Sequence, residues 1–196
     1  MGAVLAAEAL ARGHRVTVVS GPMEERLPSG VHVITVEDAR AMEAAMRRES
    51  PHADTVIMAA AVADFRAQRP RTSKLPRRRR LTLALVPTPD IISRLPRRSG
   101  QVVAGFALES GSVLPRARQK LRAKRLDMVL AQRTDRATGA PFGRRPVEAW
   151  LLSRDGTVMR LGRCSKPKVA RLLLDKVEAL WYGQPKLTTH HETAPT

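Results

Sequence analysis

Short apolar segments alternate with amphipathic segments over the first two thirds of the chain. The apolar segments have strand length and are rich in β-branched side chains, and they cover residues 15–20, 31–36, 55–61, 81–86, 101–107 and 126–131. The segments between them carry apolar side chains at helical spacing, over residues 2–12, 38–48, 90–95 and 113–124. This alternation predicts an α/β fold with a Rossmann-like, mostly parallel, doubly wound sheet.

Turn residues mark the ends of several predicted elements. Gly13 follows the first predicted helix in the position of a terminating glycine. Asp155 and Gly156 separate residues 147–152 from 157–161, which predicts a C-terminal β-hairpin, and a last helix is expected over 166–180. We therefore predict one domain over residues 1–183 and a disordered tail over 184–196.

Two segments in the middle of the chain depart from simple alternation. Residues 55–61, TVIMAAA, contain no polar side chain after Thr55, which favours a central parallel strand covered on both faces. Residues 66–80 are rich in Arg, Pro and Lys and predict a mobile basic loop.

Composition narrows the function classes. The 196 residues include 35 Lys and Arg, for a net charge of +17, but aromatic residues make up only 3%. Because the arginines are scattered and form no nucleic-acid-binding motif, a basic solvated surface is favoured over nucleic-acid binding as the main function. Part of the charge is also compatible with a phosphorylated substrate. The five histidines show no ligand spacing, so no protein metal site is predicted.

The cysteine content and the apolar runs indicate the cellular compartment in which the protein is expected. The single cysteine, Cys164, excludes an internal disulfide and suits a reducing compartment such as the cytoplasm. No apolar run reaches the roughly 20 residues of a membrane span. The first ten residues contain Glu8 and lack a basic start, which disfavours a signal peptide.

Candidate chemistry lies where three predicted strands end. In such sheets ligands bind at the carboxyl ends of the strands. The runs AAAVADF (59–65), VPTPDI (86–91) and GFALE (105–109) occupy these positions. In order and spacing, these three runs resemble signature blocks of the phosphopantothenate–cysteine ligase family. Further positions match that family: VTVVSGP at 16–22, Lys74 in the basic loop, and Lys120 with Lys124 as a K-x-x-x-K helix. The resemblance covers residues 1–180.

This resemblance implies an activity in coenzyme A biosynthesis. Such enzymes use CTP, with Mg²⁺, to convert 4′-phosphopantothenate into an acyl-cytidylate, and the amine of cysteine then displaces CMP. The resemblance also implies a homodimer and no bound flavin. The choice between CTP and ATP is left open by the residues themselves.

Site residues follow from the matched blocks. Lys74 is the implied catalytic residue and is expected to close over the triphosphate, because positioned cations stabilise the charge that develops there. Asp64 is an acceptor suited to cytosine or ribose, and Phe106 can pack on a base. The residues implied to bind nucleotide are Ala59, Ala60, Asp64, Lys74, Pro89, Asp90, Ile91, Ile92, Phe106, Lys120 and Lys124.

The chain also departs from the family pattern. The family has a first strand and an asparagine-bearing loop before the position of Met1, and residues 131–134 read AQRT where the family has an AND block. Without that strand, its neighbours are expected to show open edges, and an upstream-extended chain is expected to be more stable. Two alternatives therefore stay open: a non-catalytic homologue that still binds nucleotide, and a basic anion- or nucleic-acid-binding module.

Overall fold

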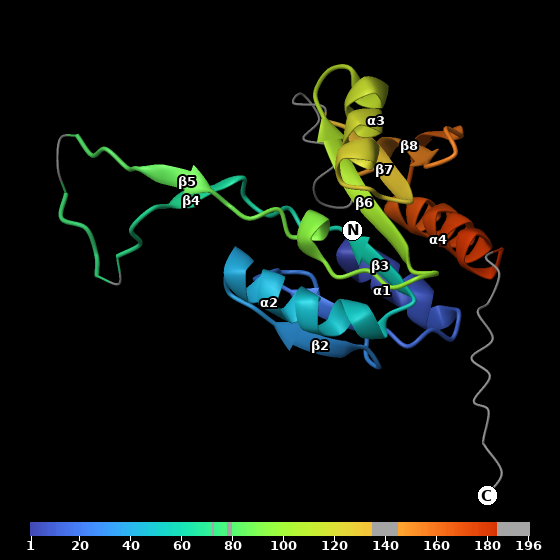
Figure 1. Ribbon diagram of the computed structural model, residues 1–196, viewed down its shortest axis with the longest axis horizontal. Coiled ribbons are helices and arrows are strands. Elements are labelled where there is room, and N and C mark those ends of the chain that lie inside the picture. Colours follow the sequence, from blue (N-terminus) through green and yellow to red (C-terminus); the bar gives the residue numbers. More distant parts are fainter. Residues whose placement is uncertain (72, 78–79, 135–144, 184–196) are drawn as a thin grey trace, which may run out of the picture.

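A sheet of five strands forms the centre of the molecule. The computed structural model describes residues 1–71, 73–77, 80–134 and 145–183. The sheet has the order β3 (Thr55–Met58), β6 (Val102–Glu109), β7 (Met128–Arg133), β8 (Val147–Ser153) and β9 (Val158–Cys164). The first three strands are parallel, and the last two form an antiparallel hairpin (Figure 1). The α/β class and the C-terminal hairpin are confirmed.

Helices cover both faces of this sheet. One core joins α2 (Ala39–Glu49) and α3 (Val113–Ala123) to side chains such as Val103 and Val129. The other joins α1 (Gly2–Ala11) and α4 (Lys166–Tyr182) to side chains such as Val102 and Met128. Because successive strand residues point to opposite faces, β6 and β7 supply both cores, and residues 128–131 are completely buried.

A separate pair of parallel strands lies at the N-terminal side. β1 (Thr17–Ser20) pairs with β2 (His32–Thr35), and η1 (Ser50–His52) leads from α2 towards β3. In the part of the chain that the structure describes, no strand pairing joins this two-stranded sheet to β3. The predicted strands are therefore present but divided between sheets, and the expected open edges are observed. The stability gain from an upstream extension stays a prediction.

β3 differs from its prediction as a central strand covered on both faces. It ends at Met58 instead of residue 61 and buries only Val56, and among the described residues it pairs with β6 alone. An apolar run alone does not distinguish a central strand from an edge strand, because that depends on which neighbours are available to pair.

A long arm, closed by a short antiparallel pair of strands, contains the predicted basic loop and replaces the predicted fourth parallel strand. β4 (Phe65–Ala67) pairs with β5 (Leu85–Pro87), and the segment between them extends away from the helices and the main sheet (Figure 1). The prediction that residues 81–86 belong to the main sheet was wrong, because this segment pairs locally with the chain just before it. The predicted helix at 90–95 is reduced to η2, a 3₁₀ turn (Ile92–Arg94).

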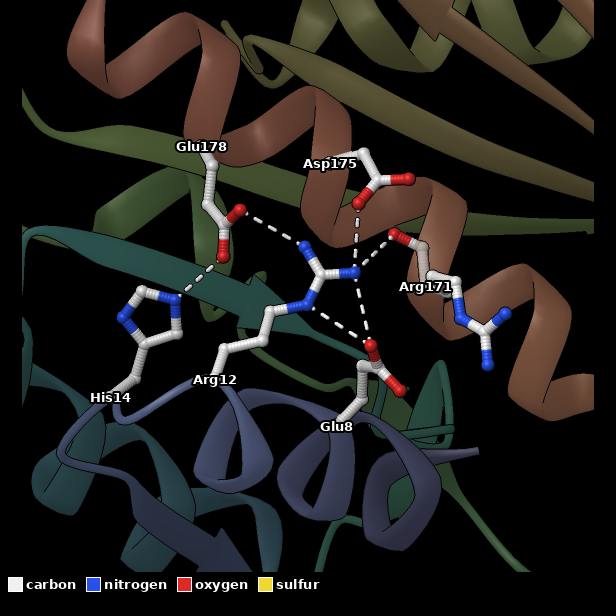
Figure 2. A network of polar contacts seen from close by, with 6 residues as sticks. All are labelled: Glu8, Arg12, His14, Arg171, Asp175 and Glu178. Carbon is white, nitrogen blue, oxygen red and sulfur yellow. Dashed lines mark hydrogen bonds and ion pairs between the residues drawn. The ribbon is translucent and has the colours of Figure 1, made fainter.

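Polar contacts fasten α1 to α4 (Figure 2). The Arg12 guanidinium lies 3.0 Å from Glu8, 2.8 Å from Asp175 and 3.0 Å from Glu178, and His14 Nε2 lies 2.7 Å from Glu178. Burial alone would lower the pKa of Arg12, but its three carboxylate partners raise it. Gly13 ends α1 at φ +83°, a conformation that favours glycine, as the sequence predicted.

The C-terminal end of the predicted domain lies at the edge of the described chain. The predicted tail, residues 184–196, lies outside the described part of the chain, so the domain boundary at 183 stays a prediction. Among the described residues, none of the helices combines the length and apolar character that crossing a bilayer requires.

Candidate functional site

A polar cleft opens where β3 ends, beside β6 and α3. It has a volume of about 220 Å³. Its walls contain all the predicted nucleotide-binding residues except Ala59 and Lys74, namely Ala60, Asp64, Pro89, Asp90, Ile91, Ile92, Phe106, Lys120 and Lys124. The segments that leave β3 and β5 and the middle of β6 therefore meet in one place, as expected of strand exits in an α/β sheet. At this volume the cleft is smaller than the roughly 300–1,000 Å³ usual for small-molecule sites, so part of a nucleotide would project from it.

The two segments that leave β3 and β5 are held together by the backbone. The amide of Thr88 donates to the carbonyl of Asp64 at 2.8 Å. This bond lies at the base of the arm and positions the Asp64 side chain at the cleft mouth, where it is exposed to solvent. Within the described residues, the Asp64 carboxylate makes no hydrogen bond or ion pair, so it is available to accept from a ligand.

Asp90 and Lys124 form an ion pair inside the cleft. Lys124 Nζ lies 3.0 Å from Asp90 Oδ2, which also accepts a 2.8 Å bond from the Ser93 hydroxyl. Burial alone would raise the pKa of Asp90, but Lys124 and Ser93 outweigh it and the pKa is lowered. Asp90 is therefore ionised at neutral pH and partly neutralises Lys124, so an incoming phosphate competes with Asp90 for that cation.

Lys120 provides the second cation of the cleft. It is partly buried and, within the described residues, has no hydrogen-bond or ion-pair partner. Burial lowers the pKa of Lys120 and the charge of Lys124 lowers it further, while Asp90, Glu109 and Asp64 act in the opposite direction. A desolvated lysine beside another lysine gains from a bound anion, which is the property a phosphate site needs.

The floor of the cleft is formed by β6. Gly105 packs so closely on the layer beneath it that a Cβ there would lie 2.7 Å from Leu126 Cδ1 and 3.7 Å from Ile92 Cδ1. Phe106, the next residue, is half-buried, lines the cleft, and also packs against the core on the α1 and α4 side. Phe106 therefore packs on the core and is also placed to contact a ligand.

Two predicted residues lie outside the cleft walls. Ala59 packs against the core on the α1 and α4 side. Lys74 is exposed in the segment between β4 and β5, which extends away from the body (Figure 1). The predicted helix that would direct backbone amides at an anion near Pro89 is also only a three-residue 3₁₀ turn, too short to build an appreciable helix dipole.

Some cleft residues were not singled out from the sequence. Met58, Val62, Ala63, Thr88 and Gly105 also line the walls. All but Met58 belong to the AAAVADF, VPTPDI and GFALE runs. Their membership of these runs could therefore have indicated that they line the cleft, whereas their side-chain chemistry could not. No cluster of three or more His, Cys, Asp or Glu side chains that could hold a metal ion occurs among the described residues.

The comparisons with known proteins agree on one family. The model of the DNA/pantothenate metabolism flavoprotein C-terminal domain matches residues 1–180. The coenzyme A biosynthesis bifunctional protein CoaBC of Bacillus subtilis is 34% identical over 183 residues, which cover 92% of this chain and 45% of that protein. The Borreliella burgdorferi protein of the same name is 31% identical, over 89% of this chain and 44% of that protein. The chain thus spans less than half the length of these relatives.

Solved structures give the same result for the fold. The C-terminal domain of a coenzyme A biosynthesis bifunctional protein CoaBC superposes with a TM-score of 0.76 at 29% identity, covering 93% of this chain and 83% of that one. A Cab2 mutant in complex with phosphopantothenate-cysteine superposes with a TM-score of 0.64, at 16% identity and over 93% of this chain and 77% of that one. The second likeness supports the fold alone.

Proposed function

Because this chain belongs to the DNA/pantothenate metabolism flavoprotein C-terminal domain family, we propose that it is a phosphopantothenate–cysteine ligase domain of coenzyme A biosynthesis. The observation that carries the proposal is the shared cleft of Asp64, Asp90, Phe106, Lys120 and Lys124. The Cab2 mutant of the same fold was solved with phosphopantothenate-cysteine, the molecule that the proposed ligation would form. The reaction would take place in the cytoplasm, which suits a chain with one buried cysteine.

The proposed reaction has two steps. A carboxylate oxygen of 4′-phosphopantothenate forms a bond to the α-phosphorus of CTP, and the bond to pyrophosphate breaks. The amine nitrogen of cysteine then attacks the acyl carbon of the cytidylate, the bond to CMP breaks, and the amine proton leaves. Both steps place negative charge on phosphate and acyl oxygens, so fixed cations lower both barriers.

The cleft residues divide this work. Lys120, which has no partner among the described side chains, and Lys124, once released from Asp90, bind phosphate oxygens. Asp64 accepts a hydrogen bond from the cytosine amino group or a ribose hydroxyl, and Phe106 packs on the base. Ala60 and the backbone of residues 89–92 form the walls against which the nucleotide lies. Mg²⁺, bound to the triphosphate, supplies further neutralisation of charge.

The arm suggests how Lys74 takes part. Phe65, Leu81, Leu83 and Leu85 are each more than half exposed along the arm, an arrangement that monomeric proteins avoid. We therefore propose that the arm packs against a second copy, giving a homodimer. A basic arm that extends away from its own cleft can then carry Lys74 to the triphosphate in the cleft of that copy.

The test is pyrophosphate release from CTP that depends on phosphopantothenate. The full-length gene product is expected to release pyrophosphate, and Lys74→Gln is expected to lower kcat by about a hundredfold or more because a transition-state cation is lost. The control Arg71→Gln changes a charge in the same arm and should retain activity within about twofold. Absence of release with either CTP or ATP would overturn the ligase proposal.

One observation favours a second candidate, a homologue that binds nucleotide without turnover. The Asp90–Lys124 pair occupies a cation that the reaction requires. If this pair does not open, CTP binding would be measurable by calorimetry while pyrophosphate release would stay absent. The two measurements made on one preparation therefore separate the two candidates.

A further inference from the structure

A second concavity, which we call the arginine pocket, lies beside α3 on the side away from the cleft. It has a volume of about 550 Å³, and five arginines line it: Arg97, Arg118, Arg122, Arg125 and Arg154. They come from the segment before β6, from α3, from the turn after α3, and from the β8–β9 hairpin turn. The arginine pocket and the cleft have no lining residue in common.

The geometry of α3 explains why the two concavities are separate. Residues four apart lie on the same side of a helix, so Arg118 and Arg122 share one side and Lys120 and Lys124 share another. Ala117 and Leu121 lie between these sides and are buried against the sheet. A ligand in the arginine pocket would therefore not touch the residues proposed to bind CTP.

Most of the positive charge in the arginine pocket is not neutralised by the protein. No Asp or Glu occurs among its lining residues in the described part of the chain. Arg154 pairs with the nearby Asp127, and Arg97 donates to the carbonyls of Lys124 and Arg125. Arg118, Arg122 and Arg125 have no side-chain hydrogen bond or ion pair within the residues described. Burial lowers the pKa of Arg97; the charge of Asp127 acts in the opposite direction, and the charges of Arg154 and Arg125 add to the decrease.

Arg125 occupies a backbone position at which glycine is the usual residue. Arg125 has φ 50°, the one residue other than glycine with positive φ in the described ranges. It follows the end of α3, where the amide of Leu126 donates to Leu121 and that of Arg125 to Arg122. Glycine is favoured at this position because it adopts positive φ without strain. Arginine therefore carries a conformational cost here, and it adds one more unpaired cation to the pocket.

The shape and the apolar floor of the pocket favour a small amphiphilic anion. Leu121, Leu126 and Leu152 are buried beneath the arginines, so the pocket offers apolar contact below and charge above. Its volume falls in the usual range of small-molecule sites, about 300–1,000 Å³. Single-stranded nucleic acid is bound on extended grooves with aromatic stacking platforms, and no aromatic side chain lines this pocket within the described residues.

We propose that the arginine pocket binds a nucleoside polyphosphate. The guanidinium groups of Arg118, Arg122 and Arg125 bind phosphate oxygens, for which the planar, multiply donating guanidinium is well suited. The flat face of the nucleoside base lies over the leucine floor. This site is separate from the cleft proposed to bind CTP.

The test uses ATP as the probe on the full-length protein, by calorimetry at about 100 mM salt, where exposed charges are partly screened. Lys120→Gln serves as the background, so that the cleft contributes little to the signal. In that background, Arg118→Gln/Arg122→Gln is expected to weaken ATP binding at least about tenfold, because two charge-assisted contacts are lost. The matched control Arg40→Gln/Arg47→Gln, which removes two exposed charges from α2, should change it less than about twofold.

A second variant separates binding from folding. Arg125→Gly removes a guanidinium but places the favoured residue at positive φ, so its melting temperature should be equal or higher while ATP binding weakens several-fold. Inorganic tripolyphosphate should compete with ATP but bind more weakly, since it lacks a body for the leucine floor. Equal ATP affinity in the double variant and its control would overturn the proposal. The proposal would also be overturned if a single-stranded oligonucleotide bound more tightly than ATP and its binding were lost in the same double variant. Because these readouts use no turnover, they are independent of the ligase assay.

Discussion

The main sheet and the β4–β5 arm are both built from apolar strands, but only the sheet is buried. Residues 128–131 of β7 are completely inaccessible, whereas Leu81, Leu83 and Leu85 of the arm are between 56% and 59% exposed. β7 has a strand on each side and a helical layer on each face. In the part of the chain that the structure describes, β4 and β5 pair only with each other, over three residues each.

This difference separates apolar residues that stabilise the chain from apolar residues that remain available to a partner. A two-stranded hairpin is at best marginally stable in water, so the arm adds little to the stability of the body. Its exposed leucines instead form the kind of surface that mediates association. The arm also carries Lys74, so the segment with the smallest share in the core bears the proposed catalytic residue.

The largest expected effect comes from making the same substitution in both regions. Leu130→Ala in β7 should lower the free energy of unfolding by about 2–5 kcal/mol, because it leaves a cavity in a packed core. Leu83→Ala in the arm should change it by less than about 0.5 kcal/mol in dilute protein, because the side chain is already hydrated. Urea unfolding followed by circular dichroism measures both. Similar losses in the two variants would show that the arm is packed like the sheet.

A smaller effect is expected from the contacts that fasten α1 to α4. Arg12→Ala should cost about 1–3 kcal/mol, since Glu8, Asp175 and Glu178 would lose a shared, partly buried partner (Figure 2). Arg12→Lys keeps the charge without the planar fork and should fall between wild type and Arg12→Ala. Thermal melts of the three proteins test this order. If Arg12→Ala melted like wild type, the α1 helix would be held by apolar packing alone.

The smallest effect is a pH dependence at the base of the arm. The pKa of Asp90 is lowered in the folded state, so the stability that its ionised form contributes is present above the unfolded pKa, near 3.9. It is lost as the pH falls through the lower folded pKa, because the unfolded chain then binds the proton first. Unfolding of wild type and Asp90→Asn, compared from about pH 5 downwards, should give a steeper acid decline for wild type. Parallel curves would contradict the assignment.

Much of the fold and of the cleft follows from local sequence. The period of apolar positions and the turn residues fix the strands, the helices, the end of α1 at Gly13 and the C-terminal hairpin. Residues of the AAAVADF, VPTPDI and GFALE runs also meet in one cleft, although GFALE lies within β6 and VPTPDI begins in the arm instead of following a strand of the main sheet. The family assignment rests on the same runs.

Features that depend on residues distant in sequence could not be predicted. The sequence gives no sign that residues 85–87 would pair with residues 65–67 and that the segment 81–86 would not join the main sheet. Nor does it indicate that Asp90 would hold Lys124, or that arginines from four segments would surround one pocket.

Sequence alone therefore determined most of the strands and helices, several of their turns, and the runs whose residues line the cleft. Tertiary structure alone decided which strand edges pair, which charges neutralise one another and which stay free. The physical reason is that periodicity and turn chemistry act over a few residues. Pairing and electrostatic contacts act through space, between groups whose separation along the chain carries no information about their distance.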